Sequence, residues 1–326
     1  MPVCNAEKHL AQAVESVLAQ SHADLRLLVV ENGSRDRSPA ILADYARRDR
    51  RVSVHAFPER LGVGGAGQAA IELAETEWVL RLDADDVMLP DCIDVQLEVL
   101  RRLPGVRAII GRAEHITGRG GTLGLSTNPA MTPAECRQRT LTGELLASIH
   151  SGTLLHRPTV IAVGGYRSKF SVLGEDTDLL ARLVEAGHDV TSHERPIVQY
   201  RLHSGSVTAA AGQRRFLHAE WVSACLKARL SHQIEPTFDN CLDAWRQLPW
   251  LERIRRRRGW TAATLYRQAA TLRGEGSWLD AGLRLVLATL LDPAGLLPRV
   301  QRNMSLIGLR RPHHEDGRAV SGDEWH

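Results

Sequence analysis

The sequence lacks the features that would assign a function at a glance. Its five cysteines are widely scattered, with neither a CxxC pair nor another metal-ligand spacing, which speaks against a zinc-ribbon or disulfide-framework protein and favours a reducing compartment. Long apolar runs are missing too: residues 279–297, the most apolar late stretch, include two aspartates, an arginine and a proline and should not span a bilayer. The net charge is only +3, which by itself indicates no class of partner.

What is present is a globular composition. Hydrophobic residues make up 43% of the 326 positions and charged residues 24%, so the chain can bury a full core as one large domain or two unequal ones. The expected strands are Leu25–Val30, Val52–Phe57, Trp78–Leu82 and Val106–Gly111. We expect four helices: one with Asn5 as its N-cap, one that begins at Ser38–Pro39, one over Ala66–Ala74 and one that Pro90–Asp91 open. This alternation predicts an α/β protein with a parallel sheet.

Three carboxylates stand within four positions at the end of the strand that begins at Trp78. Asp83, Asp85 and Asp86 would lie at the carboxyl edge of the sheet, where open α/β sheets place their ligands. Carboxylate oxygens suit Mg²⁺ or Mn²⁺, which usually takes one or two protein carboxylates together with substrate phosphates. Taken alone, the same acids could equally form a solvated turn ahead of the next helix.

A glycine pattern supports a competing interpretation. The glycines of Gly62–Gly67 match GxGxxG, and Asp83 or Asp85 would then be the acid that holds the ribose of a dinucleotide. The chain would be an NAD-dependent oxidoreductase. However, Pro58–Leu61 separate these glycines from the preceding strand, whereas the fingerprint needs its tight turn directly after the strand.

Seven motifs, taken together and in order, resemble those of the family 2 glycosyltransferases. They are residues 1–7, 16–20, 30–34, 82–86, 164–166, 174–176 and 200–206. The resemblance covers residues 1–210, and its specificity lies in the ordered set rather than in any one motif. It implies a GT-A fold, in which helices flank a mostly parallel central sheet. It also implies inverting transfer of a sugar from a nucleotide-activated donor, which we expect to be a UDP-sugar, to a saccharide or lipid-linked acceptor.

The resemblance implies roles for individual residues. The expected catalytic base is Asp176, and the expected ligands of a divalent metal, Mn²⁺ or Mg²⁺, are Asp85 and His203. The expected donor-binding residues are Pro2, Asn5, Asn32 at the base and Asp83 at the ribose. The expected acceptor-side residues are Glu175, Gly165 and Tyr166. These residue types suit the chemistry, because a cation neutralises the charge on a leaving nucleoside diphosphate and a single displacement needs one base. Without the resemblance, Glu175 and Asp176 are simply acids that the first turn of a helix favours.

Some positions depart from the family pattern. Cys4 stands where an aromatic residue can stack on the base, and Asn32 stands where an acid is commoner, although an amide carbonyl can still accept a hydrogen bond from uracil. A basic residue near Gly67 is missing. So is an apolar strand ahead of Pro2, and we therefore expect either a truncated start or a sheet that lacks a central strand.

Residues 213–326 differ in composition from residues 1–212, which we expect to form the catalytic domain. They include the arginine-rich stretch Arg253–Arg258 and five tryptophans between Trp221 and Trp278, and we expect a helical extension. Arginine with tryptophan suits an anionic membrane surface. An extension that packs its tryptophans on the catalytic domain is an equally open interpretation, and a nucleic-acid surface is a third.

The sequence therefore predicts a metal-dependent, inverting glycosyltransferase of cell-envelope polysaccharide synthesis. We expect it to be cytoplasmic and peripheral at the inner face of a membrane, with no nucleic-acid partner. Two alternatives remain open: an NAD-dependent oxidoreductase that uses Gly62–Gly67, and a non-catalytic basic protein that binds membranes or nucleic acid.

Overall fold

The computed structural model describes residues 1–126, 128–146 and 148–294, so the expected extension and the apolar stretch 279–297 are described only up to residue 294. The strands are β1 (Pro2–Val3), β2 (Leu27–Asn32), β3 (Val52–Phe57), β4 (Trp78–Leu80), β5 (Val87–Met88), β6 (Val106–Thr117), β7 (Thr122–Leu125), β8 (Leu154–His156) and β9 (Asp189–Leu202). The helices are α1 (Leu10–Leu18), α2 (Ser38–Arg48), α3 (Gly62–Leu73), α4 (Cys92–Arg102), α5 (Pro133–Leu141), α6 (Arg157–Ala162), α7 (Glu175–Glu185), α8 (Val207–Ala211), α9 (Arg214–Leu230), α10 (Phe238–Gln247), α11 (Trp250–Gly274) and α12 (Trp278–Leu291).

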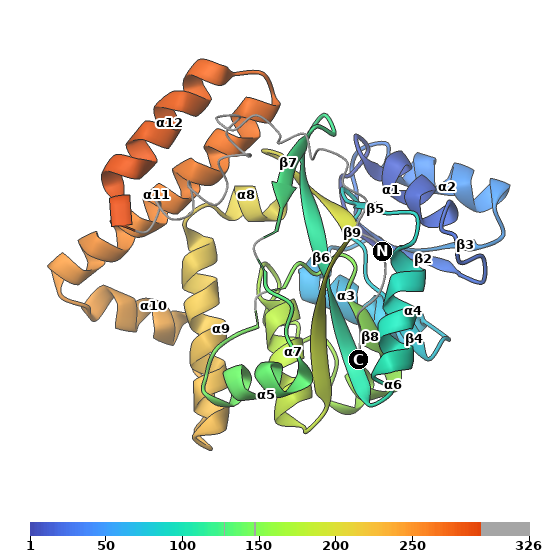
Figure 1. Ribbon diagram of the computed structural model, residues 1–326, viewed down its shortest axis with the longest axis horizontal. Coiled ribbons are helices and arrows are strands. Elements are labelled where there is room, and N and C mark those ends of the chain that lie inside the picture. The colour runs from blue at the N-terminus through green and yellow to red at the C-terminus, as the bar shows by residue number, and fades with distance from the viewer. Residues whose placement is uncertain (127, 147, 295–326) are drawn as a thin grey trace, which may run out of the picture.

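The strands form two sheets flanked by helices (Figure 1). The first, in the order β1-β2-β3, is parallel throughout. The second has the order β4-β8-β6-β9-β5, with β7 paired to β6. In it β6 and β9 are parallel, whereas β5, β7 and β8 each run against a neighbour. The predicted α/β class is confirmed, and the second sheet is mixed where the sequence predicted mostly parallel pairing.

Helices cover both faces of the first sheet, because β2 is apolar on both faces. Val29 is buried in the same cluster as Val14 of α1, and Val30 is buried in another cluster with Ala66 of α3. Such two-sided burial is why the segment is a continuous apolar run rather than an alternating one. It also brings the polar residues that follow β2 to the edge of the sheet.

Two predicted helix starts are wrong. Asn5 is not an N-cap: its backbone has a φ of 53°, its side-chain carbonyl accepts a hydrogen bond from the Arg35 N–H at 2.8 Å, and α1 begins at Leu10. Helix α3 begins at Gly62 rather than Ala66, so the glycines of Gly62–Gly67 lie inside its first turns. The small residues in these turns let the backbone of another segment pack closely against the helix. Hydrophobic periodicity alone does not reveal that the helix begins within the glycine-rich stretch.

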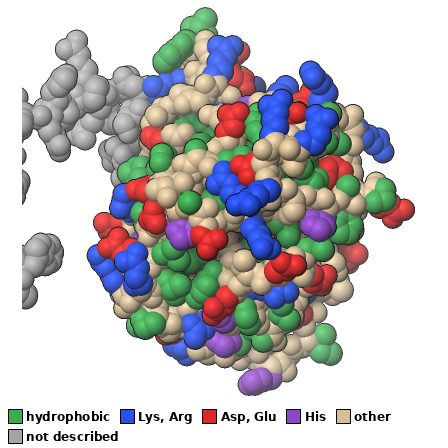
Figure 2. All heavy atoms as spheres, turned by 90° about the vertical axis from the view of Figure 1, so that its right-hand side faces the viewer, with side chains coloured by type: hydrophobic (Ala, Val, Ile, Leu, Met, Phe, Trp, Pro, Cys, Tyr) green, Lys and Arg blue, Asp and Glu red, His purple; other side chains and the backbone are tan. Residues whose placement is uncertain are grey.

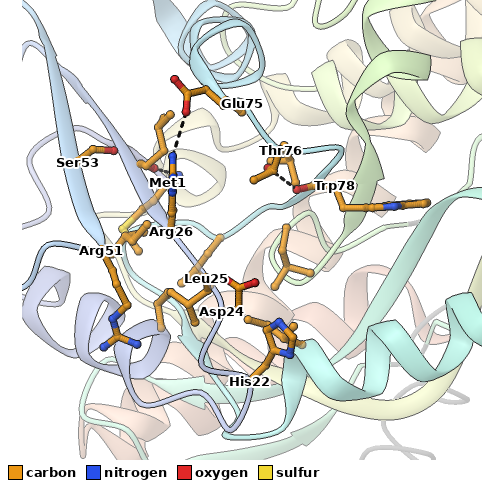
Figure 3. A pocket seen from close by; sticks show the side chains of 18 of the residues that line it. Met1, His22, Asp24, Leu25, Arg26, Arg51, Ser53, Glu75, Thr76 and Trp78 are labelled. Atoms are coloured by element: carbon orange, nitrogen blue, oxygen red, sulfur yellow. Dashed lines mark hydrogen bonds and ion pairs between the residues drawn. The ribbon is translucent and has the colours of Figure 1, made fainter.

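A large cavity separates the two sheets where β2 faces β4. Its volume is about 1200 Å³, and Leu25, Leu27, Leu80 and Leu154 are among the apolar residues that line it (Figure 3). Strand β1 is only two residues long, so it pairs with the end of β2 and leaves this space unfilled.

The amino group of Met1 lies at this cavity. It donates a hydrogen bond to the Leu28 carbonyl at 2.8 Å. Burial and, after it, the charge of the nearby Arg81 guanidinium lower the pKa of this amine to about 4. The cavity lining also includes charged side chains such as Asp24, Arg26 and Glu75.

Helices α9 to α12 pack beside the second sheet (Figure 1). Trp221 and Val222 of α9 are buried against Phe170. Asp178 of α7 is fully buried and forms ion pairs with Arg167, Arg182 and Arg229, of which Arg229 belongs to α9. This charged cluster fixes α9 against α7.

Helices α11 and α12 form an antiparallel pair at the periphery of the molecule (Figure 1). Within the described ranges, no helix has both the length and the apolar character to cross a bilayer. Figure 2, which views the molecule from the side of its N-terminal half, shows acidic and basic side chains interspersed over that face.

Candidate active site

The loop that follows β4 holds the three carboxylates, and each has different neighbours. Asp83 accepts a hydrogen bond from Arg81 Nη2 at 2.7 Å, and its own N–H donates to Ser151 Oγ at 3.0 Å. Arg81 is almost fully buried, with a side chain 7% exposed, whereas Asp83 is 38% exposed. Burial raises the pKa of Asp83, but the lowering effects, of which the Arg81 charge is the largest and the Arg81 hydrogen bond is another, together hold that pKa below its usual range.

Asp86 points inward instead. Ser151 Oγ donates to its Oδ2, and the Arg201 N–H donates to its Oδ1 at 2.8 Å. Burial, followed by the charges of Asp85 and Asp83, raises the pKa of Asp86 well above its usual value. We conclude that Asp86 ties the loop to the turn before β8 and to β9 rather than meeting a ligand.

Asp85 lies beside His203, as the resemblance implied. His203 Nε2 is 2.9 Å from Asp85 Oδ2, and both side chains are partly exposed, at 19% and 29%. The two residues are 118 positions apart in the chain. The Arg201 side chain supports this pair, because its Nε donates to the Asp85 carbonyl at 2.8 Å and its Nη2 donates to Gln12 Oε1 at 2.7 Å.

A second histidine stands next to this pair. The rings of His9 and His203 are 5.1 Å apart, edge to face. Burial and, after it, the charges of Arg201 and His203 lower the pKa of His9 to about 4. His9 is therefore neutral near pH 7.

The start of α7 brings two further acids to the same region. Asp176 accepts a hydrogen bond from Ser148 Oγ at 2.9 Å. Glu175 is 8% exposed, and burial followed by the Asp176 charge raises its pKa to about 8. The charges of Arg81 and Asp83 also act on Glu175, which places the helix start beside the loop after β4.

His150 and Tyr166 lie beneath these acids. Tyr166 Oη is 2.6 Å from His150 Nε2, and both residues are buried. Burial lowers the pKa of His150 to about 4, and Arg81 contributes in the same direction. Burial raises the pKa of Tyr166 above its usual value. The pair is thus uncharged, and it adds a rigid hydrogen-bonded support next to Asp83 and Asp176.

The expected donor-binding residues of the first sheet meet at one edge. Pro2 pairs with Val30 in β1, and Asn5 follows at the end of that strand. Asn32 ends β2, and its side-chain Oδ1 accepts a hydrogen bond from the Leu61 N–H at 2.8 Å. Two of these residues, Asn5 and Asn32, thus already hold loop backbone in this structure. Their role toward a nucleotide stays a prediction.

The expected acceptor-side residues Gly165 and Tyr166 pack on α3. Gly165 has a φ of 62°, and a Cβ there would lie 1.9 Å from Gln68 Oε1. The same Gln68 Oε1 accepts a hydrogen bond from the Tyr166 N–H at 2.8 Å. A larger residue here would adopt a strained φ and displace the Gln68 side chain, so glycine favours the hydrogen bond that holds Tyr166.

The glycine-rich start of α3 is already covered by the chain itself. The Val63 N–H donates to the Ser171 carbonyl at 3.0 Å, and a Cβ at Gly64 would meet the Arg167 carbonyl at 2.9 Å. A dinucleotide site needs these backbone N–H groups free for a pyrophosphate. The packing therefore opposes the oxidoreductase interpretation.

The structure adds four residues that the sequence interpretation missed. They are Arg81, His9, His150 and Arg201. Arg81 could have been found, because it is a charge inside the apolar run that ends in Leu82. The two histidines carry no such signal, since only the fold brings them to the acids.

The donor set fits a divalent cation held partly by substrate. Asp85 and His203 supply one carboxylate oxygen and one imidazole nitrogen, 2.9 Å apart. This pair suits Mn²⁺ or Mg²⁺ whose remaining ligands are phosphate oxygens and water. Within the described part of the chain, no three histidine, cysteine, aspartate or glutamate side chains converge as a complete protein-only metal site.

Comparison with known proteins places the chain in a family. The family described as glycosyl transferase family 2 matches residues 1–163, and the chain belongs to it. A curated relative, the succinoglycan biosynthesis protein ExoO of Rhizobium meliloti, is 36% identical over 94 residues, which are 29% of this chain and 26% of that protein. The chain spans 23 to 40% of the length of the first three curated relatives that it matches.

Solved structures share the fold at low identity. TarS of S. aureus in complex with UDP-GlcNAc aligns with a TM-score of 0.56 at 13% identity, over 93% of this chain and 90% of that one. The mannosyltransferase PcManGT of Pyrobaculum calidifontis in complex with GDP-Man and Mn²⁺ aligns with a TM-score of 0.56 at 17% identity, over 94% and 83%. The predicted GT-A fold is confirmed, and the chain is a family 2 glycosyltransferase by family and by fold.

Proposed function

We propose that the protein transfers a sugar from a nucleotide-sugar donor with inversion at the anomeric carbon, in the synthesis of a cell-envelope polysaccharide. The observation that carries this proposal is the Asp85–His203 pair, 2.9 Å apart, at the edge of a site that also holds Asp83 and Asp176. A transfer of this kind needs a diphosphate anchor and a base in one place, and these residues supply both chemistries.

Asp85 and His203 would hold a divalent cation, Mn²⁺ or Mg²⁺. Such a cation supplies the positive charge that makes a nucleoside diphosphate a good leaving group. The Arg201 guanidinium donates to the Asp85 carbonyl and so fixes the loop that presents Asp85. The complex of PcManGT with Mn²⁺ supports this proposal by fold similarity.

Asp83 would bind the ribose hydroxyls of the donor. Its pKa is held low by Arg81, so the carboxylate is ionised at neutral pH and can accept hydrogen bonds. Asn32, with Pro2 and Asn5 beside it, would line the base. Of the donors seen with fold neighbours, UDP-GlcNAc and GDP-Man, we propose the uridine class, with the uracil N–H donating to the second lone pair of the Asn32 Oδ1, which already accepts from the Leu61 N–H.

Asp176 would take the proton from the attacking hydroxyl of the acceptor. Ser148 Oγ donates to its Oδ2 and leaves Oδ1 for the acceptor. The neighbouring Glu175, with its pKa raised to about 8, is mostly protonated at pH 7 and adds no second negative charge. We propose a saccharide or lipid-linked acceptor on this side, above Gly165 and Tyr166.

A donor panel tests this function. Purified protein would be incubated with UDP-glucose, UDP-GlcNAc, UDP-galactose and GDP-mannose, with Mn²⁺ or with EDTA, and release of nucleoside diphosphate would be measured. We expect slow hydrolysis of one UDP-sugar that requires the metal. Release from none of these donors, or equal release with EDTA, would contradict the proposal.

A further inference from the structure

Helix α12 carries an apolar face that nothing in the described chain covers. Leu279, Leu283, Val286 and Leu290 are 91%, 60%, 56% and 71% exposed. Their spacing of three and four residues places them on one side of the helix. On the opposite side, Ala281 and Ala288 are buried, the latter against α11.

Each end of the helix pair has a further exposed apolar side chain. Trp278, at the start of α12, is 63% exposed, and the Arg273 guanidinium lies 5.3 Å from its ring centre. Near the other end, Arg258 of α11 donates to the Leu291 carbonyl at 3.0 Å, one turn after Ile254, which is 47% exposed. Soluble monomers rarely expose so large a continuous apolar surface unless it binds something.

The charges around this face favour one kind of partner. Residues 250–294 contain eight arginines and four acidic residues. A second copy of the chain would bring two such positive segments together, which like-charge repulsion opposes. An anionic lipid surface attracts them instead, and leucine and tryptophan side chains can enter the boundary between headgroups and acyl chains.

The arginine stretch is not the main contact, because much of it is used within the protein. Arg256 forms ion pairs with Glu220 and Glu252, and the Arg257 guanidinium lies 4.8 Å from the ring centre of Trp245, which is buried. The exposed leucines of α12 are therefore the groups left to make contact.

We propose that the α12 face, defined by Leu279, Leu283, Val286 and Leu290, docks on an anionic lipid bilayer with the helix lying in the plane of the interface. The turn between α11 and α12 borders a cavity of about 310 Å³ together with Thr117 of β6. The Thr117 carbonyl accepts a hydrogen bond from Arg201, which supports Asp85. Docking would thus hold the active site near the membrane. The benefit of this position for a lipid-linked acceptor rests on the proposed function, whereas the docking itself does not.

Co-sedimentation of the full chain with vesicles tests the docking. The probes are vesicles of phosphatidylcholine alone and of phosphatidylcholine with phosphatidylglycerol, at low and high salt. We expect binding to the anionic vesicles at low salt and weaker binding at high salt, since salt screens the arginines. The triple variant Leu279→Gln, Leu283→Gln and Leu290→Gln should bind anionic vesicles at least about tenfold more weakly, because it removes apolar burial.

The variant Ile234→Gln is the matched control. Ile234 is 96% exposed and lies outside α11 and α12, so its loss should leave vesicle binding unchanged. Nucleotide binding, measured by calorimetry, should be the same in the triple variant and in wild type, which separates docking from the proposed function. Failure of wild type to sediment with anionic vesicles would overturn the proposal. So would equal binding by the triple variant, or a wild-type dimer that the triple variant converts to a monomer.

Discussion

At the scale of single residues, three neighbouring aspartates are separated into different roles by what surrounds them. Asp83 accepts a hydrogen bond from Arg81, and Asp85 faces the partly exposed His203. Asp86 is buried and accepts hydrogen bonds from the Ser151 hydroxyl and the Arg201 N–H. Acid spacing alone cannot make this distinction. Arg81 is two positions from Asp83, but Ser151, Arg201 and His203 are more than sixty positions from the acids that they contact.

Asp176→Asn should lower turnover and leave donor binding nearly intact. A base acts on the acceptor in the transition state, and its loss typically costs about a hundred- to ten-thousandfold in rate. The amide can still accept the Ser148 hydrogen bond, so the start of α7 should keep its structure. Steady-state kinetics and UDP calorimetry on the same sample measure both quantities. Turnover within threefold of wild type would remove Asp176 from the proposed mechanism.

Glu175 should make stability fall as the pH rises. Its pKa is about 8 in the folded protein against an ordinary value of 4.5, so between these pH values the unfolded chain loses a proton that the folded chain keeps. Glu175→Gln is neutral in both states and should remove this loss. The Tm of the variant relative to wild type should therefore increase from pH 5 to pH 8.

Glu144→Gln is the control for that experiment, because the Glu144 side chain is 64% exposed. Its Tm difference from wild type should stay constant over the same range. A Glu175→Gln difference that is equally constant would show that Glu175 ionises normally in the folded protein.

At the scale of elements, the predictable parts are those fixed by local chemistry. The strands β2 and β3 lie close to their expected bounds, and the start of α7 was found from its acids and Gly174. Strand β6 begins at the expected Val106 but continues to Thr117 instead of ending at Gly111. Asn5 was misassigned because its side chain bonds to Arg35 of a distant loop instead of its own helix. The antiparallel pairing of β8 was also beyond sequence patterns, since pairing depends on contacts with β6 and β4.

The cavity between β2 and β4 predicts that an added strand would stabilise the fold. A variant with about five valine and isoleucine residues placed before Met1 could run parallel to β2 and fill the space. Each buried apolar side chain contributes about 2 kcal/mol. We expect a Tm several degrees above that of a matched glycine-serine extension, measured by calorimetry. Equal Tm values for the two extensions would show that the cavity does not accept a strand.

At the scale of the whole molecule, residues distant in the chain converge on one site. The Asp85 and His203 side chains meet although 118 positions separate them. The order of motifs in the sequence indicated this convergence only through resemblance to a family, because a spacing of that length carries no geometric information. Arg201 and His9, which the structure adds, complete the surroundings of Asp85.

Metal-dependent binding of a nucleotide is the central claim. Calorimetric titration of UDP should be done with and without Mn²⁺ on wild type, on Asp85→Asn and on the control Asp91→Asn, whose carboxylate pairs with Arg195 at the surface. We expect Mn²⁺ to tighten UDP binding about tenfold or more, equivalent to about 1.4 kcal/mol, in wild type and in Asp91→Asn. In Asp85→Asn the effect of Mn²⁺ should vanish while the melting curve stays unchanged. An Mn²⁺ effect of the same size in Asp85→Asn would contradict the account.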